Sequence, residues 1–249
     1  MSYSSSPWIR CFHPAPASTM RLVCLPHAGG SANAFRPLSA ALGASVEVLA
    51  VQYPGRHDRF IEPPLTDIHR IADDIAGDAV LWADQPWAIF GHSMGALVGF
   101  EVARRLGCGP THLFVSGHQA PDLPRKRGQD RPIHQLDNAG LIAELQLLNS
   151  AEVAALEHPE IQQLLLPTVR ADYQAVETYK FEEGPALRMP ISAYVGDADP
   201  LVDPIDAGEW RRFTAGAFRL EVFPGDHFYL QGNESTLAQA IARHLAGAR

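Results

Sequence analysis

Short apolar runs alternate with longer amphipathic stretches along the first half of the chain. Strands are predicted where apolar runs end in turn residues, at 21–25, 46–51, 87–90 and 113–116. Helices are predicted in the stretches between them, at 31–42, 67–82 and 96–106. In the second of these, Ile71, Ile75 and Ala79 are four residues apart, the spacing of one helical face. Such alternation predicts a mostly parallel sheet with helices on both faces.

The alternation stops after residue 120. The stretch 121–185 has no convincing strand but shows helical patterns at 141–148 and 161–179, with Pro167 expected to bend or split the second. Strand and helix patterns then resume, at 191–195, 218–223 and 235–245. We therefore expect one α/β domain over 1–249, in which 121–185 forms a helical lid over the carboxyl edge of the sheet.

Composition narrows the possible partners. The chain has 249 residues, 46% of them hydrophobic, and a formal net charge of −8. Nonspecific nucleic-acid binding needs a basic surface, so no nucleic-acid partner is expected. There is no signal-peptide pattern and no apolar run of membrane-spanning length, which predicts a cytoplasmic protein away from membranes. Three cysteines match no zinc or redox spacing and are predicted to be reduced: Cys11, Cys24 and Cys108.

The strongest chemical signal is a G-x-S-x-G motif at 91–95, directly after a predicted strand and before a predicted helix. That context is typical of the nucleophile turn of the α/β-hydrolase fold, so Ser93 is predicted as the nucleophile. Glycine is needed at both ends of the motif because a side chain there would clash with the adjacent strand and helix. The alternative is an ordinary Gly-Ser turn that caps a helix.

A serine hydroxyl needs a base, and the chain order in this fold is Ser, then Asp or Glu, then His. His227 follows the last predicted strand and precedes the last helix, at the same sheet edge as Ser93. His244 also comes late enough but lies inside a predicted helix. His227 is therefore predicted as the base, against the alternative of a loop histidine with no catalytic role.

The acid is expected after the penultimate strand. Three aspartates compete for this role: Asp197, Asp199 and Asp203. Asp199 is preferred because it lies well into the loop, where Pro200 restricts the backbone. Its carboxylate would hold the imidazole tautomer and stabilise the imidazolium. Asp226 is adjacent to His227 and is expected to point away, and the other aspartates are expected to form turns.

Two backbone N–H groups are expected to bind the oxyanion. The N–H of Met94 follows the nucleophile, at a helix start that favours negative charge. The second donor should come from the loop after an early strand, where Pro-His-Ala-Gly-Gly points to the N–H of Ala28. The alternative there is a simple strand-to-helix turn. His27 precedes the nucleophile, so we expect a structural or pocket-wall role for it.

Motifs for other chemistries are missing from the sequence. It contains no H-E-x-x-H, no paired histidines at ligand spacing, no G-x-x-x-x-G-K and no G-x-G-x-x-G. We therefore expect neither a metal nor an organic cofactor.

Several segments together resemble the type II thioesterases that accompany modular polyketide synthases and nonribosomal peptide synthetases. The similar segments lie at 25–31, 52–56, 90–96, 196–200 and 224–228, with 166–173 and 177–179 in the lid. The combination of Pro-His-Ala-Gly-Gly with Tyr-Pro-Gly-Arg is far more specific than G-x-S-x-G alone, and the resemblance spans nearly the whole chain.

The resemblance implies a free-standing editing enzyme. It would hydrolyse unwanted acyl groups from the phosphopantetheine arm of acyl carrier or peptidyl carrier proteins and so restore stalled assembly lines. It also implies Ser93, Asp199 and His227 as the triad and Ala28 and Met94 as the oxyanion donors. We further expect a monomer.

The lid and several arginines have more open interpretations. Apolar lid side chains are expected to line an acyl pocket or to pack the lid on the core: Leu141, Leu145, Leu148, Leu164 and Leu165. The densest basic cluster is a candidate for meeting the phosphate of the arm or an acidic carrier domain, although a solvated loop is the preferred interpretation: Arg125, Lys126, Arg127 and Arg131. Arg56 and Arg59 have a similar status.

Three rival functions fit parts of the same pattern. A small-molecule carboxylesterase or lipase would use the same triad. A cyclising or acyl-transferring terminator usually sits at the end of a synthase chain, which disfavours it here. A noncatalytic binding protein on a hydrolase fold is disfavoured because all the residue types of a triad are present.

Overall fold

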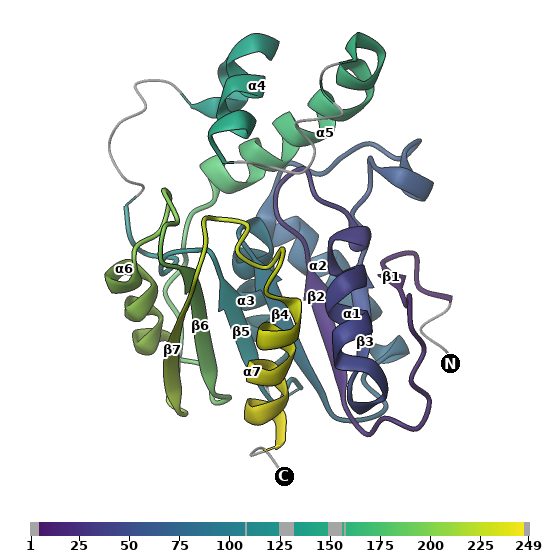
Figure 1. The fold of residues 1–249 in the computed structure, drawn as a ribbon, viewed down its shortest axis with the longest axis vertical. Coiled ribbons are helices and arrows are strands. Elements are labelled where there is room, and N and C mark those ends of the chain that lie inside the picture. The colour runs from purple at the N-terminus through teal and green to yellow at the C-terminus, as the bar shows by residue number, and fades with distance from the viewer. Residues whose placement is uncertain (1–4, 108, 125–131, 149–155, 157, 247–249) are drawn as a thin grey trace.

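A computed structural model describes residues 5–107, 109–124, 132–148, 156 and 158–246 of the chain (Figure 1). Cys108 and the basic cluster of Arg125, Lys126, Arg127 and Arg131 lie outside the described residues. The strands are β1 (Ile9–Arg10), β2 (Arg21–Leu25), β3 (Glu47–Val51), β4 (Trp87–His92), β5 (Leu113–Ser116), β6 (Ile191–Gly196) and β7 (Phe218–Phe223).

The seven strands form one sheet in the order β1-β3-β2-β4-β5-β6-β7. All neighbouring strands are parallel except β1, which pairs antiparallel with β3 at the edge. The six predicted strands are confirmed to within two residues at each end. The sequence analysis missed β1, because a two-residue strand has no measurable periodicity.

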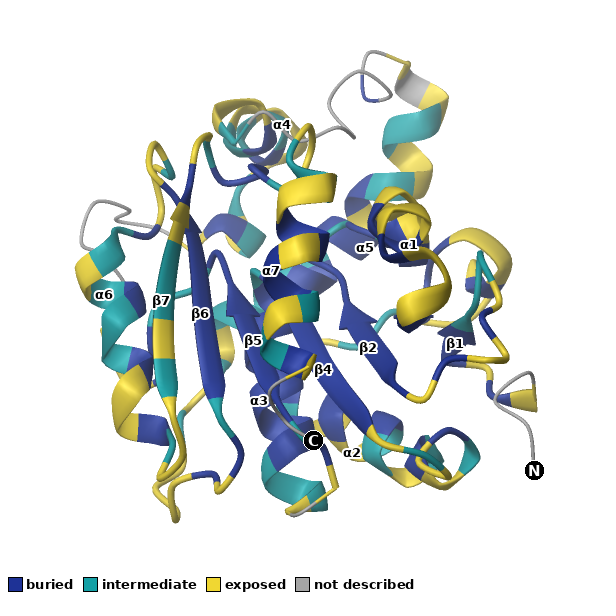
Figure 2. Cartoon of the chain, turned by 60° about the horizontal axis from the view of Figure 1, so that its bottom comes forward, coloured by how far each residue is buried: buried dark blue, intermediate teal, exposed yellow. Residues whose placement is uncertain are grey.

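Helices cover both faces of this sheet, and β2 to β6 between them are buried throughout (Figures 1 and 2). On one face lie α1 (Arg36–Leu42) and α7 (Glu234–Ala246), and on the other α2 (Ile68–Asp78) and α3 (Met94–Leu106). Each face has its own apolar core, because adjacent strand residues point to opposite sides. The predicted sheet with helices on both faces is therefore confirmed.

The lid follows β5, and its described part lies beyond the carboxyl ends of the strands (Figure 1). It contains α4 (Asn138–Leu147) and α5 (Pro159–Thr178). Of the two effects predicted for Pro167, bending or splitting the second helix, the splitting is wrong, since α5 runs through it. Pro167 and Gln163, one turn earlier, are both exposed, so water can solvate the carbonyl that loses its helical partner.

The remaining elements are short. A further helix, α6 (Pro204–Gly208), follows β6. Short 3₁₀ helices lie at Ala32–Phe35, Gly43–Ser45, His57–Arg59, Ala79–Leu81, Ile133–Gln135 and Glu209–Phe213. In the part of the chain that the structure describes, no helix combines the length and the apolar character needed to cross a bilayer.

Candidate active site

Ser93 occupies a strained turn between β4 and α3. Its φ is 54° and its ψ is −118°, a left-handed region that non-glycine residues rarely adopt. A Cβ at Gly91 would lie 2.0 Å from the carbonyl oxygen of Gly95, and one at Gly95 would lie 2.0 Å from that of Leu25. Only glycine fits at these two positions, so the packing confirms the reason given for the motif.

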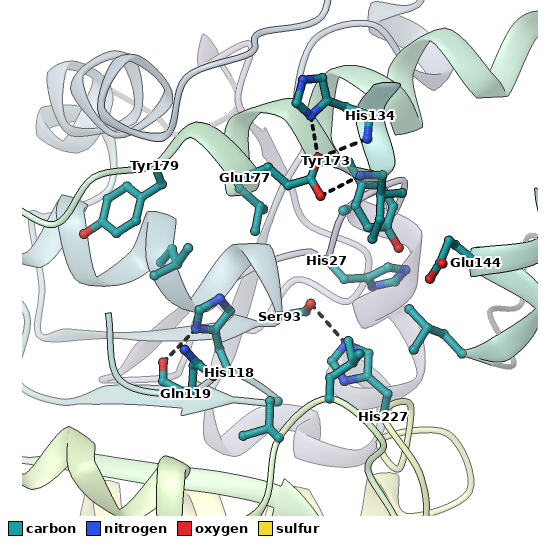
Figure 3. Close-up of a pocket in the computed structure, with 18 of the residues that line it drawn as sticks. His27, Ser93, His118, Gln119, His134, Glu144, Tyr173, Glu177, Tyr179 and His227 are labelled. Atoms are coloured by element: carbon teal, nitrogen blue, oxygen red, sulfur yellow. Dashed lines mark hydrogen bonds and ion pairs between the residues drawn. The ribbon is translucent and has the colours of Figure 1, made fainter. Parts of the chain in front are cut away.

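Ser93, His227 and Asp199 form a continuous hydrogen-bonded chain (Figure 3 shows its first link). The Oγ of Ser93 lies 3.0 Å from the Nε2 of His227, and the Nδ1 of His227 lies 2.9 Å from an Oδ of Asp199. An ionised carboxylate only accepts, so Nδ1–H donates to Asp199 and Nε2 is left to accept the serine proton. The side chains of His227 and Asp199 are 2% and 0% exposed, so the bond between them is shielded from water.

The other oxygen of Asp199 fixes that carboxylate on its loop. It accepts the backbone N–H of Leu201 at 2.8 Å and that of Val202 at 3.3 Å. The structure thus brings together the residues that the sequence analysis proposed as nucleophile, base and acid, although they are far apart in the chain.

The rival aspartates and His244 have other partners. Asp197 accepts the N–H of Gly225, and Asp203 caps α6. Asp226 accepts the N–H of Phe228 in its own turn. His244 pairs with Glu221 at 2.7 Å, outside the serine turn. These contacts favour Asp199 and His227 over the competing residues.

The candidate oxyanion donors flank the same serine. Met94 is the first residue of α3, and N–H groups of the first helical turn have no acceptor within the helix. Ala28 lies in the loop 26–31 after β2, here called the oxyanion loop, and lines one cavity together with Ser93. Both N–H groups are therefore in the neighbourhood where a carbonyl oxygen bound at Ser93 would lie.

That cavity of about 750 Å³ extends from Ser93 and His227 to the lid (Figure 3). Among the five lid leucines, Leu145 and Leu148 line it. The other three, Leu141, Leu164 and Leu165, do not line it. Leu141 and Leu165 pack in a separate core within the lid, and Leu164 is 50% exposed.

The lid wall of the cavity has a polar element that the sequence analysis missed. The buried carboxylate of Glu177 in α5 accepts the backbone N–H groups of Ile133 and His134, at 2.8 and 3.0 Å, and also contacts the His134 ring. It thereby joins α5 to the segment before α4. The spacing of these residues in the sequence gives no hint of this contact, because 43 residues separate His134 from Glu177.

The expectation that Arg56 and Arg59 are solvated is wrong. Arg56 is buried and forms a two-pronged ion pair with Asp172 of α5, at 2.7 and 2.8 Å. Arg59 is also buried, bonds to Glu62 and lies over the Trp8 ring. Neither guanidinium is exposed to meet a carrier protein.

A second histidine packs behind the base. The ring centroid of His92 is 5.1 Å from that of His227, and its Nδ1 lies 2.9 Å from Ser116 Oγ, which in turn contacts Tyr229. Burial lowers the pKa of His92 well below its usual value, and His227 and His27 lower it further. His92 therefore stays neutral beside the base. Among the described residues, no three His, Cys, Asp or Glu side chains are grouped as metal ligands.

Comparison with known proteins places the chain among characterised families. Residues 20–247 match the Thioesterase domain family. Thioesterase PikA5 of Streptomyces venezuelae is 44% identical over 250 residues, which cover 98% of this chain and 88% of that protein. The type II thioesterase BorB, from the borrelidin biosynthetic cluster, is 44% identical and superposes with a TM-score of 0.87 over 97% of this chain and 98% of its own.

A more distant solved structure agrees with these two. YbtT, a type II thioesterase from the yersiniabactin NRPS/PKS biosynthetic pathway, is 32% identical, with a TM-score of 0.86 over 97% of this chain and 99% of its own. The similarity extends over nearly the whole chain in each case. The predicted α/β-hydrolase fold, with its helical lid, is therefore confirmed.

Proposed function

The chain belongs to the Thioesterase domain family, and from that premise we propose that it is a type II editing thioesterase. Its substrates would be aberrant or stalled acyl groups on the phosphopantetheine arm of acyl carrier or peptidyl carrier proteins in polyketide or nonribosomal peptide biosynthesis. The observation that carries the proposal is the hydrogen-bonded chain from Ser93 through His227 to Asp199, which opens on a cavity large enough for an acyl group.

In the acylation step, the Oγ of Ser93 attacks the thioester carbonyl carbon while the Nε2 of His227 takes the hydroxyl proton. Asp199 stabilises the imidazolium through Nδ1–H. The carbon–sulfur bond then breaks, and the departing sulfur takes the proton from His227. The acyl group remains as an ester on Ser93.

Deacylation repeats the same proton transfers with water. Nε2 of His227 takes a proton from the attacking water, the tetrahedral intermediate collapses, and Ser93 recovers its proton as the free acid leaves. In both steps negative charge develops on the carbonyl oxygen, where we assign the N–H groups of Ala28 and Met94. Removing one such donor typically costs about 3–4 kcal/mol of transition-state stabilisation.

The shape of the cavity supports an acyl substrate that enters under the lid. Leu145 and Leu148 come from the lid, whereas Ser93 and His227 come from the body, so the acyl group would lie between the two. We also infer that the protein acts as a single-domain monomer, which light scattering of the purified chain would test.

Mass spectrometry of a panel of acylated carrier domains tests the proposal most directly. We expect the protein to release acyl groups as free acids and Ser93→Ala to release none above background. Simple esters of the same acyl groups provide the comparison with an esterase or lipase. Faster hydrolysis of the esters than of every carrier-bound thioester would contradict the proposal and favour the rival function.

A further inference from the structure

We propose that Asp172, together with Arg56, is a positioning residue that fixes the oxyanion loop from the lid. The inference rests on the proposed function, in which the N–H of Ala28 binds the oxyanion. The two residues touch the oxyanion loop but do not touch the reacting atoms. We call this ion pair the clamp. Its two members come from α5 of the lid and from the loop after β3.

The clamp carboxylate bonds directly to the oxyanion loop. Oδ2 of Asp172 accepts the backbone N–H of Gly29 at 2.7 Å and an N–H of Arg56 at 2.7 Å, while Oδ1 accepts a second N–H of Arg56 at 2.8 Å. The side chains are 1% and 5% exposed. The two-pronged pair with Arg56 is strong and directional, so it orients the carboxylate of Asp172. The single charge-assisted bond from that carboxylate to Gly29 then restricts the position of Gly29.

The guanidinium holds the other side of the same loop. Arg56 donates to the carbonyl oxygen of Gly30 at 3.0 Å, so adjacent loop residues are fixed by opposite ends of one ion pair. The N–H of Gly29 belongs to the planar peptide that it shares with Ala28. Fixing this plane therefore restricts the orientation of Ala28, whose own N–H is the candidate oxyanion donor.

The face of α5 that presents Asp172 makes further contacts with the body. Thr168, one turn before Asp172, donates to the carbonyl oxygen of Gly55 at 2.7 Å. Between them, Val169 packs so closely that a Cβ on Gly29 would lie 3.1 Å from it, and Gly29 has a φ of +80°. A movement of α5 would therefore move the oxyanion loop with it, and a misplacement of about 1 Å in such a donor can cost roughly 100-fold in rate.

Stability alone does not require this arrangement. A buried ion pair that is replaced as a whole by apolar groups often leaves a protein as stable as before, because desolvation of the two charges offsets their attraction. The double variant Asp172→Leu/Arg56→Met is therefore expected to fold while leaving Gly29 without its acceptor. The double variant Asp172→Asn/Arg56→Gln removes both charges and the Arg56 bonds, but it keeps a side-chain oxygen at position 172 that can accept the N–H of Gly29.

The experiment measures kcat and KM on a small thioester, S-butanoyl-N-acetylcysteamine, together with inhibition by a butyl trifluoromethyl ketone. This ketone adds to the serine and places an oxyanion in the hole. For Asp172→Leu/Arg56→Met we expect kcat to fall by about 10- to 100-fold, KM to change by less than about threefold, and inhibition to weaken by the same factor as kcat/KM. For Asp172→Asn/Arg56→Gln we expect most of the activity to return.

Arg59→Met/Glu62→Gln is the matched control, since it removes an ion pair of the same loop that does not touch the oxyanion loop. Its kcat should stay within about threefold of the unmodified protein. Should Asp172→Leu/Arg56→Met fail to fold, Asp172→Glu replaces it, because it keeps the charge but displaces the carboxylate by one methylene. The proposal is overturned if either variant folds, lacks a correctly placed acceptor for the N–H of Gly29, and still shows unchanged kcat and inhibition.

The same design separates failure of the clamp from failure of the proposed function. If carrier-bound acyl groups stay intact while the small thioester is hydrolysed, the carrier substrate is wrong and the clamp is still tested. If carrier domains are deacylated equally well with and without the clamp, the function stands and the clamp is overturned.

Discussion

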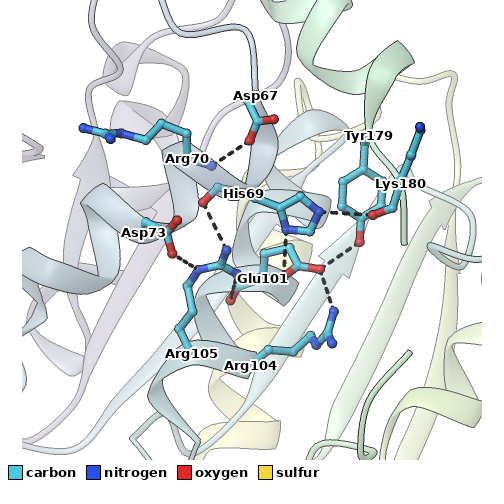
Figure 4. Close-up of polar contacts among 9 residues, drawn as sticks. All are labelled: Asp67, His69, Arg70, Asp73, Glu101, Arg104, Arg105, Tyr179 and Lys180. Carbon is cyan, nitrogen blue, oxygen red and sulfur yellow. Dashed lines mark hydrogen bonds and ion pairs between the residues drawn. The ribbon is translucent and has the colours of Figure 1, made fainter. Parts of the chain in front are cut away.

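Two buried carboxylates bind guanidinium groups where the lid meets the body, and they differ in what surrounds them. Asp172 has one arginine, Arg56, and a backbone N–H of the oxyanion loop. Glu101 of α3 accepts from Tyr179 at 2.8 Å and from two arginines, Arg104 at 2.9 Å and Arg105 at 2.7 Å (Figure 4). His69 lies 3.5 Å from the same carboxylate.

The two carboxylates therefore differ in whether they influence turnover. Asp172 contacts a loop beside the nucleophile, whereas Glu101 lies about two turns further along α3 than Ser93, roughly 12 Å along the helix axis. Glu101 also has several donors, so losing one leaves the others in place. We therefore expect changes at the clamp to alter turnover, and changes at Glu101 to lower the free energy of unfolding without altering turnover.

The largest expected effect is on kcat alone, with little change in stability. Asp199→Asn should keep the geometry of the site but present the wrong imidazole tautomer to Ser93, lowering kcat by about 10,000-fold. The thermal unfolding midpoint should change little, because Asn can still accept the N–H groups of Leu201 and Val202. Single-turnover kinetics on a thioester, with calorimetry as the control, measure both. A loss below about tenfold would remove Asp199 from the triad.

Next in size is the cost of breaking each ion pair from the arginine side. Arg56→Met leaves the carboxylate of Asp172 buried without a counter-charge, and we expect a loss of about 3–5 kcal/mol in the free energy of unfolding. Arg105→Met leaves Glu101 its bonds to Arg104 and Tyr179, so about 1 kcal/mol is expected. Urea titration of the two variants measures the contrast. Equal losses would show that the number of donors does not distinguish the two carboxylates.

The sequence predicted the parts of the site that local chemistry determines. Ser93 could be placed because its turn has to be Gly-x-Ser-x-Gly between a strand and a helix. His227 and Asp199 could be placed because parallel strands end at one edge of the sheet, so the loops after β6 and β7 converge there.

The parts that depend on distant partners were missed. Arg56 in a polar, turn-forming segment is typical of a solvated loop, yet the residue is buried, because its partner lies 116 positions later in the chain. The roles of the lid leucines could not be predicted either. Periodicity predicts the helices but not which of their faces meets the cavity. Glu101, on the other hand, lies in a predicted helix, where nothing local distinguishes it from a solvated glutamate.

The pH dependence of stability shows how much the charge of Glu101 contributes to the fold. Burial alone would raise the pKa of Glu101, but the bonds from Tyr179 and Arg105 and the charge of Arg104 outweigh it, so the pKa lies below its usual value. The folded state therefore binds this proton less readily than the unfolded state. The stabilisation is fully present above the usual pKa of about 4.5 and is lost as the pH falls through the lower, folded-state value.

Glu101→Gln should accordingly be less stable than the unmodified protein at pH 7, by about 1–2 kcal/mol, and the gap should close on acidification. Denaturant titrations at several pH values between 7 and 3 measure it, with kcat at pH 7 as the control that we expect to stay within about threefold. A gap independent of pH would mean that the charge of Glu101 contributes nothing to stability.

The smallest expected effect comes from Tyr179→Phe. This change removes one hydrogen bond to Glu101 and keeps the ring that lines the active-site cavity, so about 1 kcal/mol of stability should be lost. Because the carboxylate keeps Arg104 and Arg105, kcat and KM should be unchanged. Tyr179 lines the cavity and also bonds to Glu101, so this variant tests directly whether the contacts of Glu101 influence the active site. If kcat falls while stability stays the same, the contacts of Glu101 also affect turnover. The expectation that only Asp172 influences turnover is then wrong.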